Sequence, residues 1–172
     1  MRFGPAGALR PRPDPVRLTP LPSAGDPQVV FLGVLRGGRR ASFLLSSRAT
    51  ATGDGRCRPS PSSCQVLDLA PGETEFLDVR DPARGLVQYE LDLVGIGARH
   101  LPNRVRAVRL RRRESHAGRR LVNGSASPAL SHLTYSVSLG ALVTRLPPVP
   151  RAGSTPTRLV APSAAAALPF HW

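Results

Sequence analysis

The sequence predicts a mainly β fold: a small antiparallel sandwich or partial barrel, followed by one possible helix (α+β). Short apolar runs, rich in β-branched and aromatic residues, alternate with turn-forming residues through the middle of the 172-residue chain. The chain also contains 19 Pro and 16 Gly, which disfavour a bundle of helices. With 41% hydrophobic residues, the chain can form one modest core.

Composition divides the chain into four regions. Residues 1–27 contain seven prolines, which predict an extended Pro-rich linker, disordered like the Pro-rich C-terminus. Residues 28–96 are expected to form a β-rich core that carries both cysteines, and residues 97–145 an Arg-rich extension of helix or strand. Residues 146–172 are again Pro-rich and are expected to be a disordered tail.

Five strands are expected in the core. They are predicted over residues 29–35, 41–46, 65–69, 74–79 and 86–94. The first two form a hairpin around Gly37-Gly38, and a long loop is expected over residues 50–63. In the last strand, polar side chains at every second position predict one solvated face.

The Arg-rich extension is ambiguous over residues 103–121. Asn103 can cap a helix whose apolar positions recur every three or four residues, and this helix is favoured. Alternation of Arg with apolar residues at the start of the segment fits a strand instead. Farther on, residues 133–139 and 141–143 indicate a late strand or a hairpin bent at Gly140.

Cys57 and Cys64 are the only cysteines, and a polar, turn-prone spacer separates them. This spacer favours a disulfide, which would add about 2–3 kcal/mol of stability and imply an oxidising compartment. Two free thiols or half of a metal site are the alternatives. The metal site is the less favoured of these, because the chain has neither CxxC spacing nor a histidine nearby.

The cysteine segment has a recognisable pattern, Thr52-Gly53-Asp54-Gly55-Arg56-Cys57, then Pro59-Ser60-Pro61 and Cys64. It resembles uncharacterised exported domains of high-GC bacteria, which carry a TGDGxCxPSxxxC loop between strands after a Pro-rich linker. The resemblance covers about residues 27–96 and implies export and a disulfide, but no activity. Residues 1–11 lack the apolar run of a signal peptide, so either Met1 is not the true start or the protein is not exported.

The basic residues are unevenly distributed. The formal net charge is +13, every basic residue is Arg, and residues 97–172 hold twelve Arg against Glu114 alone. Guanidinium groups bind phosphate oxygens bidentately, which predicts a polyanion-binding segment. Its candidate residues are Arg104, Arg106, Arg109, Arg111, Arg112, Arg113, Arg119 and Arg120. A solvated basic face, or arginine enrichment through GC-rich codon usage, is the alternative, and no aromatic residue in this segment can stack on bases.

No catalytic residue, metal or cofactor is expected. The absence of Lys excludes P-loop, pyridoxal and Schiff-base chemistry, and the four His lie apart from most carboxylates. Asp54 is expected to form a turn instead of binding Ca²⁺. Four carboxylates are expected to lie on solvated strand faces and not to pair as acid and base: Asp68, Asp78, Glu90 and Asp92.

These observations favour a non-catalytic, extracytoplasmic β-domain with a binding or structural role at the cell envelope. The expected partner is an envelope protein or an anionic polymer, and no membrane span is expected because no apolar run approaches about 18 residues. The alternative is a cytosolic Arg-rich protein that binds nucleic acid.

Overall fold

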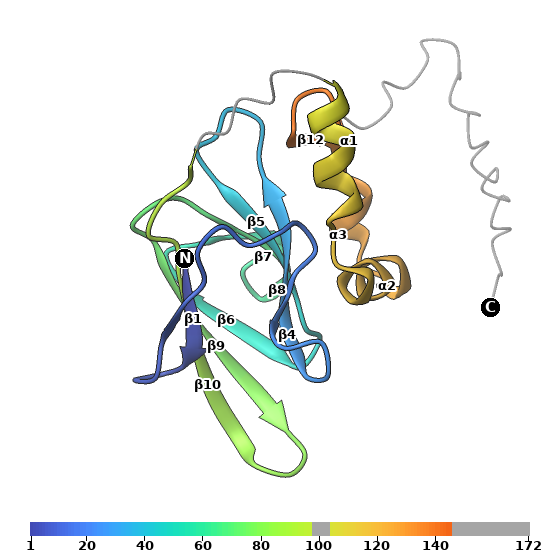
Figure 1. The fold of residues 1–172 in the computed structure, drawn as a ribbon. Coiled ribbons are helices and arrows are strands. Elements are labelled where there is room, and N and C mark those ends of the chain that lie inside the picture. The colour runs from blue at the N-terminus through green and yellow to red at the C-terminus, as the bar shows by residue number, and fades with distance from the viewer. Residues whose placement is uncertain (98–103, 146–172) are drawn as a thin grey trace, which may run out of the picture.

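The computed structural model describes residues 1–97 and 104–145, which form a sandwich of two five-stranded antiparallel sheets with an α-β extension on one side (Figure 1). The first sheet has the order β2 (Arg10–Pro11), β1 (Arg2–Pro5), β10 (Gly85–Asp92), β9 (Thr74–Asp81) and β6 (Ala49–Gly53). The second has the order β3 (Pro20–Pro22), β4 (Pro27–Val34), β5 (Ala41–Leu45), β8 (Ser63–Leu69) and β7 (Arg56–Ser60). The mainly β prediction is confirmed.

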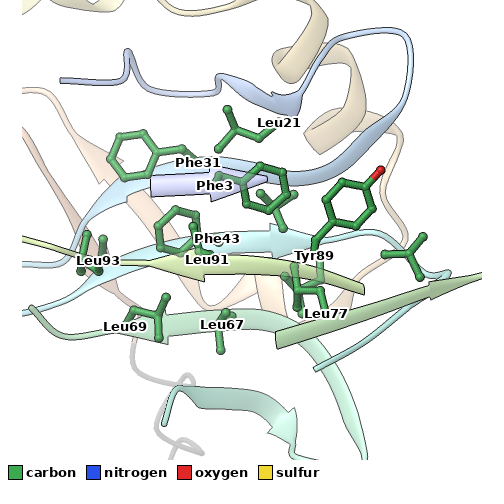
Figure 2. Packing of buried hydrophobic residues seen from close by; sticks show 14 residues of the cluster. Phe3, Leu21, Phe31, Phe43, Leu67, Leu69, Leu77, Tyr89, Leu91 and Leu93 are labelled. Atoms are coloured by element: carbon green, nitrogen blue, oxygen red, sulfur yellow. The ribbon is translucent and has the colours of Figure 1, made fainter. Parts of the chain in front are cut away.

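The main core lies between the two sheets, as Figure 2 shows. Its largest members are Phe3, Leu21, Phe31, Phe43, Leu67, Leu69, Leu77, Tyr89, Leu91 and Leu93. The rings of Phe3 and Tyr89 stack with centroids 5.6 Å apart, which joins β1 to β10. Because burial of one such side chain contributes about 1.5–3 kcal/mol, this layer provides the main driving force for closing the sandwich.

All five strands predicted in residues 28–96 are present as β4, β5, β8, β9 and β10. In β4 successive side chains enter two different cores. Val29 and Phe31 face the first sheet, whereas Val30 and Leu32 belong to a second apolar cluster on the opposite face. A strand buried on both faces has a continuous apolar sequence, which is what residues 29–35 show.

The prediction that residues 1–27 form a linker is wrong, and so is the expectation that this Pro-rich terminus is disordered. This segment provides β1, β2 and β3, and it places Phe3 and Leu21 in the core with 1% and 2% of their surface exposed. Pro11, Pro20 and Pro22 are tolerated because β2 and β3 are the edges of their sheets, where one side of the strand has no partner that needs an N–H donor.

The prediction of a long loop over residues 50–63 is also wrong, because most of these residues belong to strands. β6 pairs with β9 in the first sheet, and β7 pairs with β8 in the second. The chain therefore changes sheets at Asp54, between two glycines. The Gly-Asp-Gly turn marked this crossing, and the β-branched residues Thr50 and Thr52 were the overlooked strand signal.

The extension contains α1 (Arg104–Arg112), α2 (His116–Gly124), α3 (Pro128–Ser131), β11 (Leu133–Ser136) and β12 (Ala141–Thr144). The helix favoured near residues 103–121 is present but divided, because Ser115 caps a new helix by accepting a hydrogen bond from the N–H of Gly118. The hairpin expected near Gly140 is confirmed as β11–β12. The expected cap Asn103 and the expected disordered tail, 146–172, lie outside the described residues.

The extension covers the outer face of the second sheet (Figure 1). There a second apolar cluster joins the sheet to α2, α3 and β12, with the buried members Leu18, Val30, Leu32, Leu44, Val66, Ala129 and Leu142. Gly118 of α2 packs so closely against the backbone of Leu18 that a Cβ at this position would overlap the carbonyl oxygen of Leu18. The described extension is therefore docked onto the sandwich along this face.

Candidate binding cleft and the arginine-rich surface

A cleft of about 1120 Å³ lies where one end of the sandwich meets the extension. Most of its walls come from five stretches of chain, 13–17, 31–38, 93–97, 110–114 and 135–141, with Met1 and Ala41 beside them. The β4–β5 turn is attached to the extension by a hydrogen bond of 2.8 Å from the N–H of Arg36 to the carbonyl of Leu142. The position of the extension therefore determines the shape of the cleft.

One wall of the cleft carries a compact charge network. Glu114 is buried, with 4% of its surface exposed, and accepts hydrogen bonds from Arg17 at 2.6 Å and from Arg119 at 2.9 Å. The guanidinium carbon of Arg17 lies 4.3 Å above the centre of the Tyr135 ring, a cation–π contact. This network joins the N-terminal segment, the α1–α2 junction and β11.

The electrostatics of this wall favour a neutral Tyr135. Burial raises the pKa of its phenol, and the nearby charge of Glu114 raises it further, whereas Arg17 opposes the shift. The Glu114 carboxylate binds both guanidinium groups and so balances one of the two positive charges of Arg17 and Arg119. The inner wall therefore offers an aromatic face and a paired cation instead of an isolated charge.

The rest of the cleft combines apolar walls with a basic rim. Leu139 and Val94 line it and keep 53% and 64% of their surface exposed. Arg113 and Asp14 also line it, and Arg36 and Arg39 flank Gly37 and Gly38 of the β4–β5 turn, the two glycines that line it. Within the described ranges, these three arginines have no acidic partner. A ligand here would meet apolar side chains first and positive charge at the rim.

The candidate polyanion-binding arginines are divided by the structure. Five are exposed: Arg109, Arg111, Arg112, Arg113 and Arg120. Arg119 instead pairs with Glu114, so its charge is used within the fold. Arg104 and Arg106 belong to α1, but their side chains lie outside the described part of the structure.

On α1 the exposed arginines alternate with exposed apolar residues. Val105 and Val108 are exposed, and the helical period places them on the same face as Arg109 and Arg112. Of the predicted arginines whose side chains the structure describes, only Arg113 lines the cleft. The arginine surface and the cleft are therefore neighbouring features that share one predicted residue.

The disulfide between Cys57 and Cys64 is confirmed and joins β7 to β8, with the two Cα atoms 4.9 Å apart. Both cysteines are partly buried against the main core. The bridge lies in a hairpin at the edge of the second sheet, where β7 has a partner on one side only. It fastens this edge strand to the body of the sheet.

The glycines beside Asp54 are required by close packing. A Cβ at Gly53 would lie 2.5 Å from the carbonyl oxygen of Thr74, and one at Gly55 would overlap the side chain of Leu67. Asp54 itself accepts a hydrogen bond from the N–H of Thr74, so it braces the sheet crossing. The most specific part of the sequence pattern therefore has a structural explanation.

Below this crossing lies Glu75, a buried carboxyl group that sequence reasoning did not single out. Its Oε2 accepts a hydrogen bond of 2.9 Å from the N–H of Gly55. Burial raises the pKa of Glu75, with further raising by Asp54 and Glu73, and the hydrogen bond from Gly55 opposes the shift. The two glycines that lie opposite Glu75 were the feature of the sequence that could have indicated this buried carboxyl group.

The expectation that the strand carboxylates lie on solvated faces is wrong for two of the four. Asp68 is buried and bound by Ser42 and Arg58. Asp92 is buried and bound by Arg2 and Thr74. The two remaining carboxylates, at positions 78 and 90, stay partly exposed on β9 and β10. An arginine partner in each pair makes burial possible for a carboxylate that sequence alternation assigned to solvent.

No protein-family model, curated protein or solved structure matches the chain. Among residues 1–97 and 104–145, no three His, Cys, Asp or Glu side chains are grouped closely enough to hold a metal ion. No helix in these same ranges has the length and apolar character needed to cross a membrane.

Proposed function

We propose that this protein is a non-catalytic, extracytoplasmic β-domain that binds a protein partner at the cell envelope. The observation that supports this most is the cleft between the sandwich and its extension, which combines exposed apolar walls with a basic rim. A concave, partly apolar surface with a few positioned polar groups is typical of a binding site.

The chemistry of the cleft favours an acidic, partly apolar peptide segment as the ligand. Carboxylates of such a segment would pair with Arg113 and with the arginines of the β4–β5 turn. Its apolar side chains would cover Val94 and Leu139, and a ring or methyl group would contact Tyr135. A purely anionic polymer would satisfy the rim but would leave the apolar walls exposed.

Binding to synthetic peptides tests the cleft. We expect a peptide of alternating Glu and Leu to bind more tightly than poly-Glu or alternating Arg and Leu, by fluorescence anisotropy. Leu139→Asp should weaken binding at least about tenfold, because it places a carboxylate against an acidic ligand. The control is Leu86→Asp, since Leu86 is 69% exposed near the β9–β10 turn and does not line the cleft. Equal binding by both variants would exclude the cleft as the site.

The disulfide supports the extracytoplasmic assignment, because such bonds persist in oxidising compartments. Cells that produce the protein naturally are quenched with acid, and free thiols are alkylated under denaturing conditions. We expect the peptide that contains both cysteines to be unalkylated and two hydrogens lighter than the dithiol form. Alkylation of both residues would contradict export.

A second candidate function, nucleic-acid binding, is favoured by one observation: the exposed arginines of α1 and α2. If it is correct, log K for duplex DNA or RNA should fall steeply with log salt, with a slope of about −0.9 per phosphate contact on B-DNA. Replacing Arg109, Arg112 and Arg120 by Ala should reduce this slope. A slope that the triple variant leaves unchanged would exclude this surface.

A further inference from the structure

A second pocket, of about 850 Å³, lies at the opposite end of the second sheet and shares no lining residue with the cleft. Its walls are the start of β4, the β5–β6 corner, the turn of the disulfide hairpin and the end of α2 with the residues that follow. It is therefore an open pocket bordered by three loops and one helix end, and the disulfide holds one of these loops in place.

Gln28 lines this pocket and has an unusual hydrogen-bonding state. Its side chain is buried, with 1% of the residue exposed, and its Nε2 donates to Oδ1 of Asp26 at 2.6 Å. A carboxylate cannot donate, so this bond fixes which end of the amide is nitrogen. The other end, Oε1, is buried and accepts no hydrogen bond from any described residue. A buried acceptor left unsatisfied costs about 1–3 kcal/mol, which favours a ligand that supplies a donor.

Hydroxyl groups dominate the polar part of the pocket. Six serines line it: Ser46, Ser47, Ser62, Ser63, Ser125 and Ser127. Ser127 donates to Oε1 of Gln65 at 2.6 Å and thereby fixes the loop after α2 against β8. Each hydroxyl can donate and accept, so the lining suits a ligand that carries several groups of both kinds.

The pocket has little free charge. Arg48 is the one charged residue among the described residues that line it, and its guanidinium pairs with Asp26 at 2.9 Å. The remaining walls are aliphatic, with Val30, Leu44 and Leu121 among them. Paired charge, hydroxyl groups and aliphatic carbon together favour a neutral ligand over a phosphate or a carboxylate.

We propose that this pocket binds a neutral sugar of one or two rings, and that the side chains covering Oε1 of Gln28 shift on binding so that one O–H or N–H of the sugar donates to it. The volume is in the range of small-molecule sites, about 300–1,000 Å³. The serines provide exchangeable donors and acceptors for the ring hydroxyls, and Val30 and Leu44 face its C–H groups. This site is independent of the peptide-binding cleft, and failure of one proposal leaves the other standing.

Titration with defined sugars, followed by heteronuclear NMR, tests the proposal. The probes are glucose, maltose, N-acetylglucosamine and its β-1,4-linked disaccharide, with glucuronate as the anionic comparison. At least one neutral probe should produce saturable shifts, at millimolar concentration or below, in the side-chain amide of Gln28 and in residues 125–127. No saturable shift with any neutral probe, or tighter binding of glucuronate, would overturn the proposal.

Two variants and one control localise the binding. Gln28→Met removes the acceptor, and Ser47→Trp fills the pocket from its exposed side, so each should weaken binding at least about tenfold. Ser138→Trp is the control, because Ser138 is an exposed serine that lines the other cleft. If Gln28→Met fails to fold, sugar binding by Ser47→Trp alone tests the proposal. Undiminished binding by Ser47→Trp, as well as sugar-induced shifts confined to the other cleft, would overturn the proposal.

Discussion

Arg17 and Glu114 are joined by a hydrogen bond of 2.6 Å across 97 residues of sequence, and this contact ties the N-terminal segment to the junction of α1 and α2. A backbone bond from the N–H of Ser115 to the carbonyl of Arg17 reinforces it. Because Glu114 is the one acidic residue after position 96, the basic extension has a single carboxylate through which it can ion-pair with the sandwich. The geometry of the cleft depends on this contact.

We expect Glu114→Ala to destabilise the protein by about 3 kcal/mol, because two arginines lose their buried partner. Urea unfolding measures the loss, and hydrogen exchange should rise most in residues 116–144. Asp78→Ala is the control, since Asp78 is partly exposed and accepts a hydrogen bond from Gln88 on the adjacent strand. Its cost should stay below about 1 kcal/mol. Equal losses in the two variants would show that Glu114 does not hold the extension in place.

Two glycines of α2 provide a matched pair. Gly118→Ala should destabilise the protein by about 2 kcal/mol despite the higher helix propensity of Ala, because its Cβ would overlap the carbonyl oxygen of Leu18. Gly124→Ala should be neutral or stabilising by at most about 1 kcal/mol, since a Cβ there meets nothing within 4 Å. Thermal or urea unfolding measures both. If both substitutions stabilise, α2 is not seated against Leu18.

Glu75 predicts a pH-dependent difference in stability. Its pKa is raised in the folded state, so the protein is most stable while Glu75 is protonated and loses stability as the pH rises through the folded-state pKa. Glu75→Gln keeps an oxygen that can accept from the N–H of Gly55 but cannot ionise. The stability of this variant relative to the wild type should therefore increase between pH 4 and pH 7 in urea unfolding. A difference that stays constant would contradict a raised pKa.

The sequence predicted those parts of the fold whose signal is local. The strands of residues 28–96 have apolar runs bounded by turns, and the β11–β12 hairpin has a glycine at its bend. β1 and β3 escaped prediction because each contributes one large core side chain, Phe3 and Leu21, among residues that resist regular structure. β1 is further stabilised by pairing with β10 and β3 by pairing with β4, and such long-range pairing cannot be predicted from a local sequence pattern.

The candidate site was less predictable than the fold. Its wall brings together Arg17, Glu114 and Tyr135, which lie far apart in the sequence and share no motif. The arginine segment is prominent in composition, yet Arg119 pairs with Glu114, and among the arginines with described side chains in this segment only Arg113 lines the cleft. Net charge reports how many arginines a segment has, whereas the ion pairs that form on folding decide which of them are available to a partner.

The Cys57–Cys64 bond predicts a loss of about 2–3 kcal/mol on its removal, because it closes a short loop and so restricts the unfolded chain. The double substitution Cys57→Ser, Cys64→Ser tests this by urea unfolding, with reduced wild type as the comparison. Hydrogen exchange should rise first in β7, since this edge strand pairs with β8 alone. If the wild type has the same unfolding midpoint with and without reductant, backbone pairing alone holds the hairpin and the disulfide contributes nothing to stability.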